Sequence, residues 1–407
     1  MATPLLQPTT SAERIQALDF LRGFALLGIL IVNIQSFAMP GAAYLNPTAF
    51  GDFEGLNQWV WMFTHIFGDQ KFMTIFSILY GAGILLVTQK AEQRTGKSAG
   101  LHYRRTFWLL VIGLIHAHLI WHGDILVPYA LCALFVFLFR KAKPTTLLIV
   151  GIIFMAVHTL IYVFFGMTLS QWPPEAAAEV KQIWIPTERA MQAEVAALTG
   201  SLSDQIGRVS SEATVMQTFV FFILMLWRAG GLMLVGMALY KWGVLTAKRS
   251  GAFYKKGMLV GWLIGFPLVI YGVYKNFDAG WTFEYSMYLG SQFNYWGSLF
   301  VSFGYICGIM LIATSQVLPW LRDRLAAVGQ MALTNYIAQS VICVFIFFGI
   351  GFGLFGQIER AGQFIIFLSI WALQIVYSRP WLNKYRFGPL EWVWRSLTYW
   401  QKQPFRK

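Results

Sequence analysis

Charged side chains are scarce in this chain. Of its 407 residues, 31 are Lys or Arg and 18 are Asp or Glu, so 12% are charged, about half the share that is usual in a soluble domain. Apolar types make up 57% of the chain. A soluble fold cannot bury that much apolar surface, because surface area grows too slowly with size. The composition therefore excludes soluble, disordered, collagen-like and coiled-coil proteins, and it leaves a polytopic membrane protein.

Cysteine is also rare, and the motifs of several enzyme classes are missing. Cys132, Cys307 and Cys343 lie inside apolar runs, which predicts small buried side chains and no disulfide framework. The sequence has no HExxH motif and no closely spaced cysteine pair, so we expect no metal site. It has no Walker motif either, which argues against ATP-driven transport by this chain alone.

Long apolar runs without the alternating pattern of barrel strands predict an all-α transmembrane bundle. We expect about ten spans within a single integral-membrane domain that covers residues 1–407. The third and fourth runs are short, and they predict either a helical hairpin or one long helix. The runs are 18–38, 68–88, 106–121, 124–140, 145–167, 214–240, 257–274, 295–316, 331–355 and 361–378.

Positive residues alternate between the segments that join these runs. With the N-terminus placed in the cytoplasm, 24 of the 31 Lys and Arg residues fall on the inner side, six on the outer side and Arg228 inside a run. Cytoplasmic loops of membrane proteins are enriched in Lys and Arg. The alternation therefore predicts that both termini are cytoplasmic. The net charge of +13 then reflects topology and anionic lipid, and we expect no nucleic-acid partner.

Two segments outside the runs have a distinct character. Segment 168–213 contains more acids than bases and is predicted to be an extracytoplasmic loop, with short interfacial helices in its Ala- and Glu-rich middle. Segment 379–407 is basic, aromatic and amphipathic, which predicts a cytoplasmic tail that lies against the membrane surface.

Charged residues in or beside a span are costly and usually face a partner or a cavity, so they are the first candidates for function. The densest polar cluster holds His116, His118, His122 and Asp124 at a predicted outer turn. A neutral histidine can take a proton from a hydroxyl group, and an adjacent carboxylate can orient its tautomer. This is the chemistry of acyl transfer or of a proton relay. Histidines that are hydrogen-bonded in the bundle for structural reasons are the alternative.

Further polar residues lie in or beside other spans. Each has a simpler explanation as an ion pair, an interfacial anchor or a satisfied core residue. Arg228 lies in mid-span and needs a carboxylate, a phosphate or water as its partner. The remaining candidates are the pair Asp19 and Arg22, spaced to share a helix face, the outer group His65, Asp69 and Lys71, and the inner group Thr334, Asn335, Tyr336 and Gln339.

Several of these segments carry a family resemblance that spans nearly the whole chain. The sequence resembles the YeiB-like family of bacterial inner-membrane proteins, a domain of unknown function, and this implies a multi-pass protein of the bacterial inner (cytoplasmic) membrane. The motifs that carry the resemblance include Leu18-Asp19-Phe20-Leu21-Arg22-Gly23, Gly123-Asp124-Ile125-Leu126, Met331-Ala332-Leu333-Thr334-Asn335-Tyr336 and Gly388-Pro389-Leu390-Glu391-Trp392.

At longer range the sequence is similar to transmembrane acyltransferases such as heparan-alpha-glucosaminide N-acetyltransferase, which share an Asp-x-x-Arg-Gly first helix. The similarity implies transfer of an acyl group from cytoplasmic acetyl-CoA or another acyl-CoA to a glycan, lipid or small acceptor on the far side. In those enzymes the active histidine precedes the second helix and is followed by Asn-Gly. His65 is the nearest equivalent here, but no Asn-Gly follows it. On the resemblance we prefer His116 as the general base, because it lies in the predicted helix that leads to Gly123-Asp124.

The acyltransferase hypothesis gives a role to each remaining candidate. Asp124 is expected to orient His116 or His122, and Lys71 to stabilise the oxyanion. Two other hypotheses stay open: a small-solute or proton-coupled transporter, and a non-enzymatic envelope or lipid-binding membrane protein. Membrane lipids are expected partners in each case, and self-association is left open. The expected donor-binding residues are Asp19, Arg22, Arg228, Asn335 and Tyr336.

Overall fold

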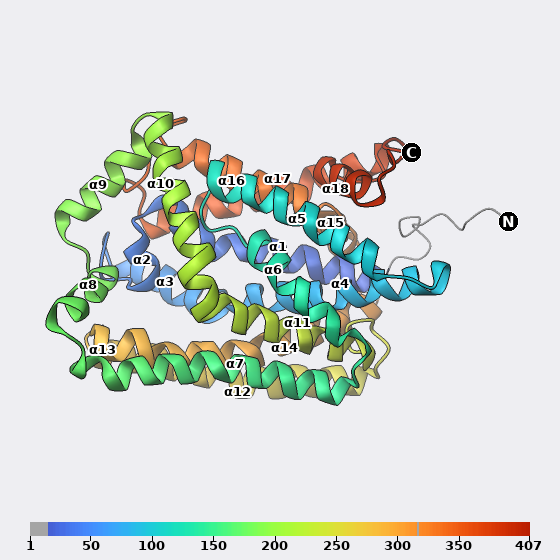
Figure 1. Cartoon of the computed structure of the whole chain (residues 1–407), viewed down its shortest axis with the longest axis horizontal. Coiled ribbons are helices and arrows are strands. Elements are labelled where there is room, and N and C mark those ends of the chain that lie inside the picture. The colour runs from blue at the N-terminus through green and yellow to red at the C-terminus, as the bar shows by residue number, and fades with distance from the viewer. Residues whose placement is uncertain (1–14, 316) are drawn as a thin grey trace.

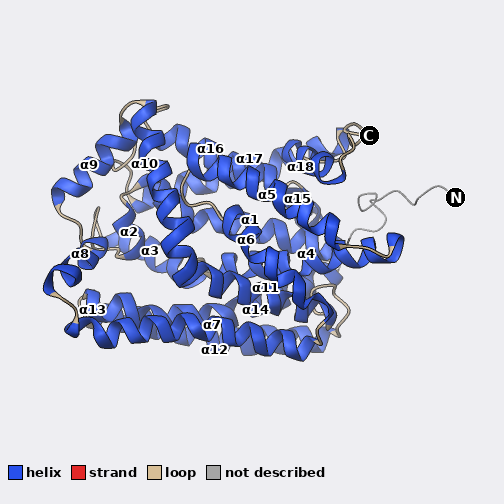
Figure 2. Cartoon of the chain, in the orientation of Figure 1, coloured by secondary structure: helices blue, strands red, loops and turns tan. Residues whose placement is uncertain are grey.

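The computed structural model describes residues 15–315 and 317–407, and every regular element in these ranges is helical (Figure 2). Helices satisfy all internal backbone hydrogen bonds, which apolar surroundings require. The α-helices are α1 (Gln16–Ala38), α2 (Gly41–Leu45), α3 (Gly55–Phe67), α4 (Lys71–Thr95), α5 (Ala99–Leu119), α6 (Leu126–Val136), α7 (Pro144–Thr168), α8 (Pro174–Trp184), α9 (Glu188–Thr199), α10 (Leu202–Val215), α11 (Leu226–Lys241), α12 (Gly251–Asp278), α13 (Phe283–Tyr285), α14 (Ser291–Thr314), α15 (Pro319–Gln330), α16 (Ala332–Phe347), α17 (Arg360–Lys384) and α18 (Pro389–Tyr399).

Seven helical segments of the described ranges are long and apolar enough to cross a membrane, and the pair α15–α16, bent by 81°, makes an eighth. The structure thus confirms a multi-pass helical bundle, with seven or eight spans by length and composition where the sequence predicts about ten. The difference lies in the α5–α6 hairpin. Helix α6 has 11 residues and is roughly 17 Å long, which is shorter than a hydrocarbon core of about 30 Å.

The long helices run side by side along the long axis of the molecule (Figure 1). At one end, which we call the loop end, lie α2, α8, α9 and α13. At the other, which we call the tail end, lie α18, the start of α1 and the turn between α11 and α12 (Figure 1). Helices α8, α9 and all but the last two residues of α10 lie in the segment 168–213, where the sequence predicts short interfacial helices. The strongest helix pairings are α12 with α14, α7 with α11, α1 with α15, and α4 with α11.

Glycine permits the closest of these contacts. A Cβ atom added to Gly23 of α1 would lie 1.8 Å from the carbonyl oxygen of Leu325, and one added to Gly329 of α15 would lie 1.9 Å from the carbonyl oxygen of Asp19. The backbones of α1 and α15 therefore touch directly, as small residues allow in membrane helices. The same kind of contact joins α4 to α11.

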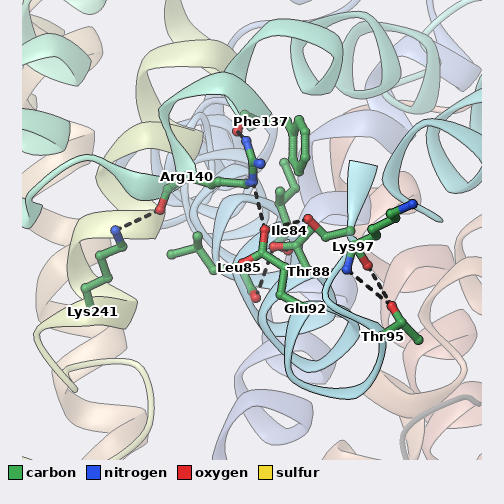
Figure 3. Close-up of polar contacts among 10 residues, drawn as sticks. Ile84, Leu85, Thr88, Glu92, Thr95, Lys97, Phe137, Arg140 and Lys241 are labelled. Carbon is green, nitrogen blue, oxygen red and sulfur yellow. Dashed lines mark hydrogen bonds and ion pairs between the residues drawn. The ribbon is translucent and has the colours of Figure 1, made fainter. Parts of the chain in front are cut away.

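At the tail end, polar contacts fasten three neighbouring segments (Figure 3). Arg140, in the short helix that follows α6, lies 3.4 Å from the Glu92 carboxylate of α4. Lys241, the last residue of α11, donates hydrogen bonds to the carbonyl oxygens of Arg140 and Ala142, at 2.8 and 2.6 Å. Side chains near the ends of α4 and α11 thus hold the turn that leads into α7.

Candidate functional site

The turn between α5 and α6 forms a buried His–Asp pair. His116 Nδ1 lies 2.8 Å from Asp124 Oδ1, and the residues are 1% and 7% exposed. The second carboxylate oxygen of Asp124 accepts a hydrogen bond from the Val127 N–H at 2.6 Å. His116 Nε2 is buried and has no hydrogen-bond partner within the described ranges. One ring nitrogen is therefore fixed by a carboxylate, and the other is available to exchange a proton.

Aromatic side chains surround this pair. The Tyr336 hydroxyl accepts a hydrogen bond from the Ile125 N–H at 3.2 Å, and the Tyr336 ring lies 5.2 Å from the His116 ring. Trp121 stacks on Phe37 of α1, with ring centroids 4.0 Å apart. This apolar environment excludes water and strengthens the interaction between His116 and the Asp124 carboxylate.

The other histidines of the predicted cluster do not join the pair. His118 Nδ1 lies 2.8 Å from the Ser210 hydroxyl, and its Nε2 lies 3.2 Å from Gln217 Oε1. These contacts hold α5 against α10 and the π-helix that follows it. Burial, helped by the positive charge of Arg208, lowers the pKa of His122 to about 4. His116 is thus the histidine of this cluster that contacts Asp124.

The lowered pKa of His122 makes the fold sensitive to acid. Because the unfolded chain protonates His122 below about 6.5 and the folded chain does not do so until about 4, stability is expected to fall as pH drops between these values. Between pH 6.5 and 5 the loss is at most about 2 kcal/mol. Thermal unfolding in detergent at both pH values should show a smaller acid shift in His122→Asn than in the native chain. Equal shifts in both proteins would contradict this assignment.

A second polar cluster lies where α3 ends and α4 begins. The break falls at Gly68, Asp69 and Gln70, and Gln70 adopts a left-handed backbone conformation with φ of 63°. The Lys71 ammonium is fully buried and donates hydrogen bonds to the carbonyl oxygen of His65 at 2.7 Å and to Asn294 Oδ1 at 2.6 Å.

Asn294 links this lysine to a carboxylate. Its side-chain amide donates a hydrogen bond to Asp69 Oδ2 at 2.7 Å, and His65 Nδ1 lies 3.2 Å from the same oxygen. The structure therefore brings together the predicted outer residues His65, Asp69 and Lys71. Asn294 completes the group, and no local sequence pattern could reveal it, because α4 ends at Thr95 and α14 begins only at Ser291.

Arg228 belongs to α11 and contacts α4 at Thr74, one helical turn beyond Lys71. Its guanidinium donates hydrogen bonds to the hydroxyl groups of Thr74 and Ser298 and to the carbonyl oxygen of Tyr295, at 3.1, 2.8 and 3.1 Å. It also lies over the Tyr295 ring, 4.3 Å from the centroid. We call the residues His65, Asp69, Lys71, Asn294 and Arg228 the α4–α14 cluster.

The predicted donor-binding residues lie in separate places. Arg22 is paired with Asp19 at 2.8 Å, close to the contact between α1 and α15. Arg228 belongs to the α4–α14 cluster, and Tyr336 lies beside the His–Asp pair. Asn335 lies between α15 and α17: its amide donates hydrogen bonds to the carbonyl oxygen of Val328 in α15, at 3.1 Å, and to the hydroxyl group of Ser378 in α17, at 3.2 Å.

Helix α18 contacts the two helices that carry Tyr336 and His116. Glu391 accepts hydrogen bonds from the backbone N–H groups of Leu333 and Thr334, at 2.6 and 3.1 Å, and so caps α16 directly after the bend. Burial raises the pKa of Glu391. Trp394 of α18 donates a hydrogen bond to the carbonyl oxygen of Arg105 in α5 at 2.9 Å. The Gly388-Pro389-Leu390-Glu391-Trp392 motif therefore has a capping role that its sequence did not suggest.

Taken together, the helical spans and the polar clusters buried between them define a multi-pass membrane protein with charged groups inside its bundle. Residues 239–401 match the family described as "Protein of unknown function (DUF418)". The chain is 31% identical to the uncharacterized protein YxaH of Bacillus subtilis, over 99% of this chain and 98% of the relative. It is 29% identical to the uncharacterized protein YeiB of Escherichia coli, over 95% of this chain and 96% of that relative. The chain therefore belongs to the YeiB-like family.

Proposed function

We propose that this protein is a membrane-embedded acyltransferase that uses an acyl-CoA as the donor. The buried His116–Asp124 pair carries this proposal, because His116 Nε2 has no hydrogen-bond partner among the residues that the structure describes. His116 Nε2 takes the proton of the acceptor hydroxyl or amine as that group attacks the thioester carbonyl. The C–S bond then breaks, and the departing thiolate receives the proton from His116. Asp124 stabilises the imidazolium that exists between the two proton transfers.

The proposed topology has ten crossings, with both termini in the cytoplasm of a bacterium and the bundle in its inner membrane. The alternation of Lys and Arg supports it, since the turns after α4, α6 and α11 all carry basic residues and lie at the tail end with α18 (Figure 1). The α5–α6 hairpin supplies the two additional crossings, the second of them formed by α6 together with the short 3₁₀-helix Phe137–Lys141 that continues it. Under this topology α8–α10 are extracytoplasmic, and segment 379–407 is cytoplasmic.

Acyl transfer can be tested with the purified protein in detergent. We expect labelled acetyl-CoA at concentrations up to roughly millimolar to bind and to transfer its label to an envelope lipid, glycan or small acceptor. His116→Gln should lower the rate by roughly 10²- to 10⁴-fold, because a positioned general base contributes that much. His118→Gln is the matched control, and it should retain transfer. Failure of folded protein to bind any acyl-CoA would overturn the proposal.

A second candidate function is transport of a small or proton-coupled solute. It is favoured by the two interrupted spans, α3–α4 and α15–α16, because broken helices in transporters often flank a substrate site. Proteoliposomes would then show solute flux that responds to a pH gradient, is lost in His116→Gln and gives no covalent product. Solute flux without acyl transfer would favour this candidate, and acyl transfer without solute flux would exclude it.

A further inference from the structure

The α4–α14 cluster holds more positive than negative charge. Lys71 and Arg228 are 0% and 1% exposed. Within residues 15–315 and 317–407, neither forms an ion pair with a carboxylate, and Asp69 is the acidic group that interacts electrostatically with both. Asp69 is already hydrogen-bonded to Asn294 and lies beside His65. One carboxylate therefore faces two buried basic side chains.

Lys71 and Arg228 bind to neighbouring turns of the contact between α4 and α14. Lys71 and Thr74 are one turn apart on α4, and Asn294 and Ser298 are one turn apart on α14. Lys71 donates to Asn294, while the guanidinium of Arg228 donates to both Thr74 and Ser298. The N-terminus of α4, where backbone N–H groups carry partial positive charge, lies at the same place. The positive potential is therefore concentrated between α4 and α14.

An uncompensated charge inside a membrane bundle is costly, and such charges usually mark a binding site. Arginine and lysine side chains bind carboxylate and phosphate oxygens by charge-assisted hydrogen bonds. We propose that the α4–α14 cluster binds an oxyanion group, a carboxylate or a phosphate, and that this group is part of the acceptor substrate. Assignment of the anion to the acceptor rests on the proposed acyltransferase function; the anion site itself does not.

The cluster is accessible at one edge. The side chains of His65 and Asp69 are 19% and 20% exposed, whereas Lys71 and Arg228 lie behind them. Both exposed residues precede α4, at the end of that helix nearer to α3 and the loop end (Figure 1). An acceptor that enters from the loop end thus meets His65 and Asp69 first and the two cations second.

Anion binding can be measured with purified protein in an uncharged detergent, by thermal unfolding and calorimetric titration. One arm uses inorganic phosphate, and the other uses a short-chain phosphatidylglycerol, with phosphatidylcholine as its matched zwitterionic lipid. Binding of phosphate indicates a soluble acceptor, and binding of phosphatidylglycerol alone indicates a lipid acceptor. Either result supports the oxyanion site. Failure of phosphate, of phosphatidylglycerol and of acetate, a carboxylate probe, to bind the native chain overturns it.

Three variants test the cluster itself. Lys71→Met and Arg228→Gln should each weaken anion binding by roughly tenfold or more, because each removes a buried charged partner. Asp69→Asn should strengthen binding several-fold, because it removes the competing negative charge, and no misfolded protein would give that result. Unchanged or weaker binding in Asp69→Asn would refute the proposal.

A control variant and a functional comparison separate the two proposals. Lys181→Gln removes a cation that is about half exposed and is paired with Glu284, so anion affinity should not change. His116→Gln should keep anion binding while it loses acyl transfer. Anion binding without any transfer activity would support the anion site and reject the acyltransferase. Acyl transfer without anion binding would support the acyltransferase and reject the anion site.

Discussion

Replacement of Asp124 by Asn is expected to lower acyl transfer by about 10⁴-fold while the protein stays folded. The Asn side chain keeps an oxygen for the Val127 N–H, so the turn before α6 can remain intact. Its amide, however, would donate a hydrogen bond to His116 Nδ1 and place the remaining ring proton on Nε2. Nε2 would then be a donor and could not accept the proton of the acceptor.

The measurement must distinguish a role of Asp124 in positioning His116 from a role in the folding of the protein. Because Asp124 contacts His116 and acts through it, we expect kcat to fall and the KM for the acyl-CoA to stay within a few-fold of the native value. Asp278→Asn is the matched control, since Asp278 forms a surface pair with Lys275 away from the site. A loss of donor binding equal to the loss of rate would instead assign Asp124 to the structure of the donor site.

The second large effect concerns the packing of α1 against α15. Gly329→Ala is expected to destabilise the fold by roughly 3 kcal/mol or more, because the new methyl group meets backbone atoms that cannot rotate away. The nearest are the carbonyl oxygen of Asp19 at 1.9 Å and the backbone nitrogen of Gly23 at 2.6 Å. The expected result is a large drop in the thermal unfolding midpoint in detergent, or a failure to accumulate in the membrane.

Gly83→Ala provides the matched control. Gly83 also lies inside a spanning helix, but a Cβ atom at this position meets nothing within 4 Å. Since alanine is the better helix former, this variant should be as stable as the native chain or slightly more stable. Equal stability of the Gly329→Ala and Gly83→Ala proteins would show that α1 and α15 can separate without cost.

The sequence predicts helices well where apolar runs are continuous, and less well where helices break. The second run was expected at 68–88, but its helical segment begins at Gly55 and is interrupted before Lys71. The ninth was expected at 331–355, whereas α15 and α16 meet there at 81°. The cap at the start of α16 comes from Glu391, which follows Leu333 by 58 residues. Such a long-range contact leaves no signal in a local window of hydropathy.

The candidate site, too, could be predicted from the sequence only in part. His116 and Asp124 are eight residues apart, so the sequence could suggest that they meet, although it left His122 as an equal partner for the carboxylate. The turn decides between them, because α5 ends near Leu119 and directs His116 toward Asp124. The neighbours of Lys71 and Arg228 could not be predicted, since Asn294 and Ser298 come from α14.

The contacts of α18 have a consequence for the time at which the His–Asp pair is complete. Helix α5, which carries His116, and helix α16, which carries Tyr336, both contact α18, through Trp394 and Glu391 respectively. Because synthesis proceeds from the N-terminus, α18 leaves the ribosome after every other described helix. While the protein is being made, the start of α16 therefore lacks its cap, and α5 lacks its neighbour at the tail end. Catalytic competence is thus expected to arise late, only after the whole bundle has been inserted.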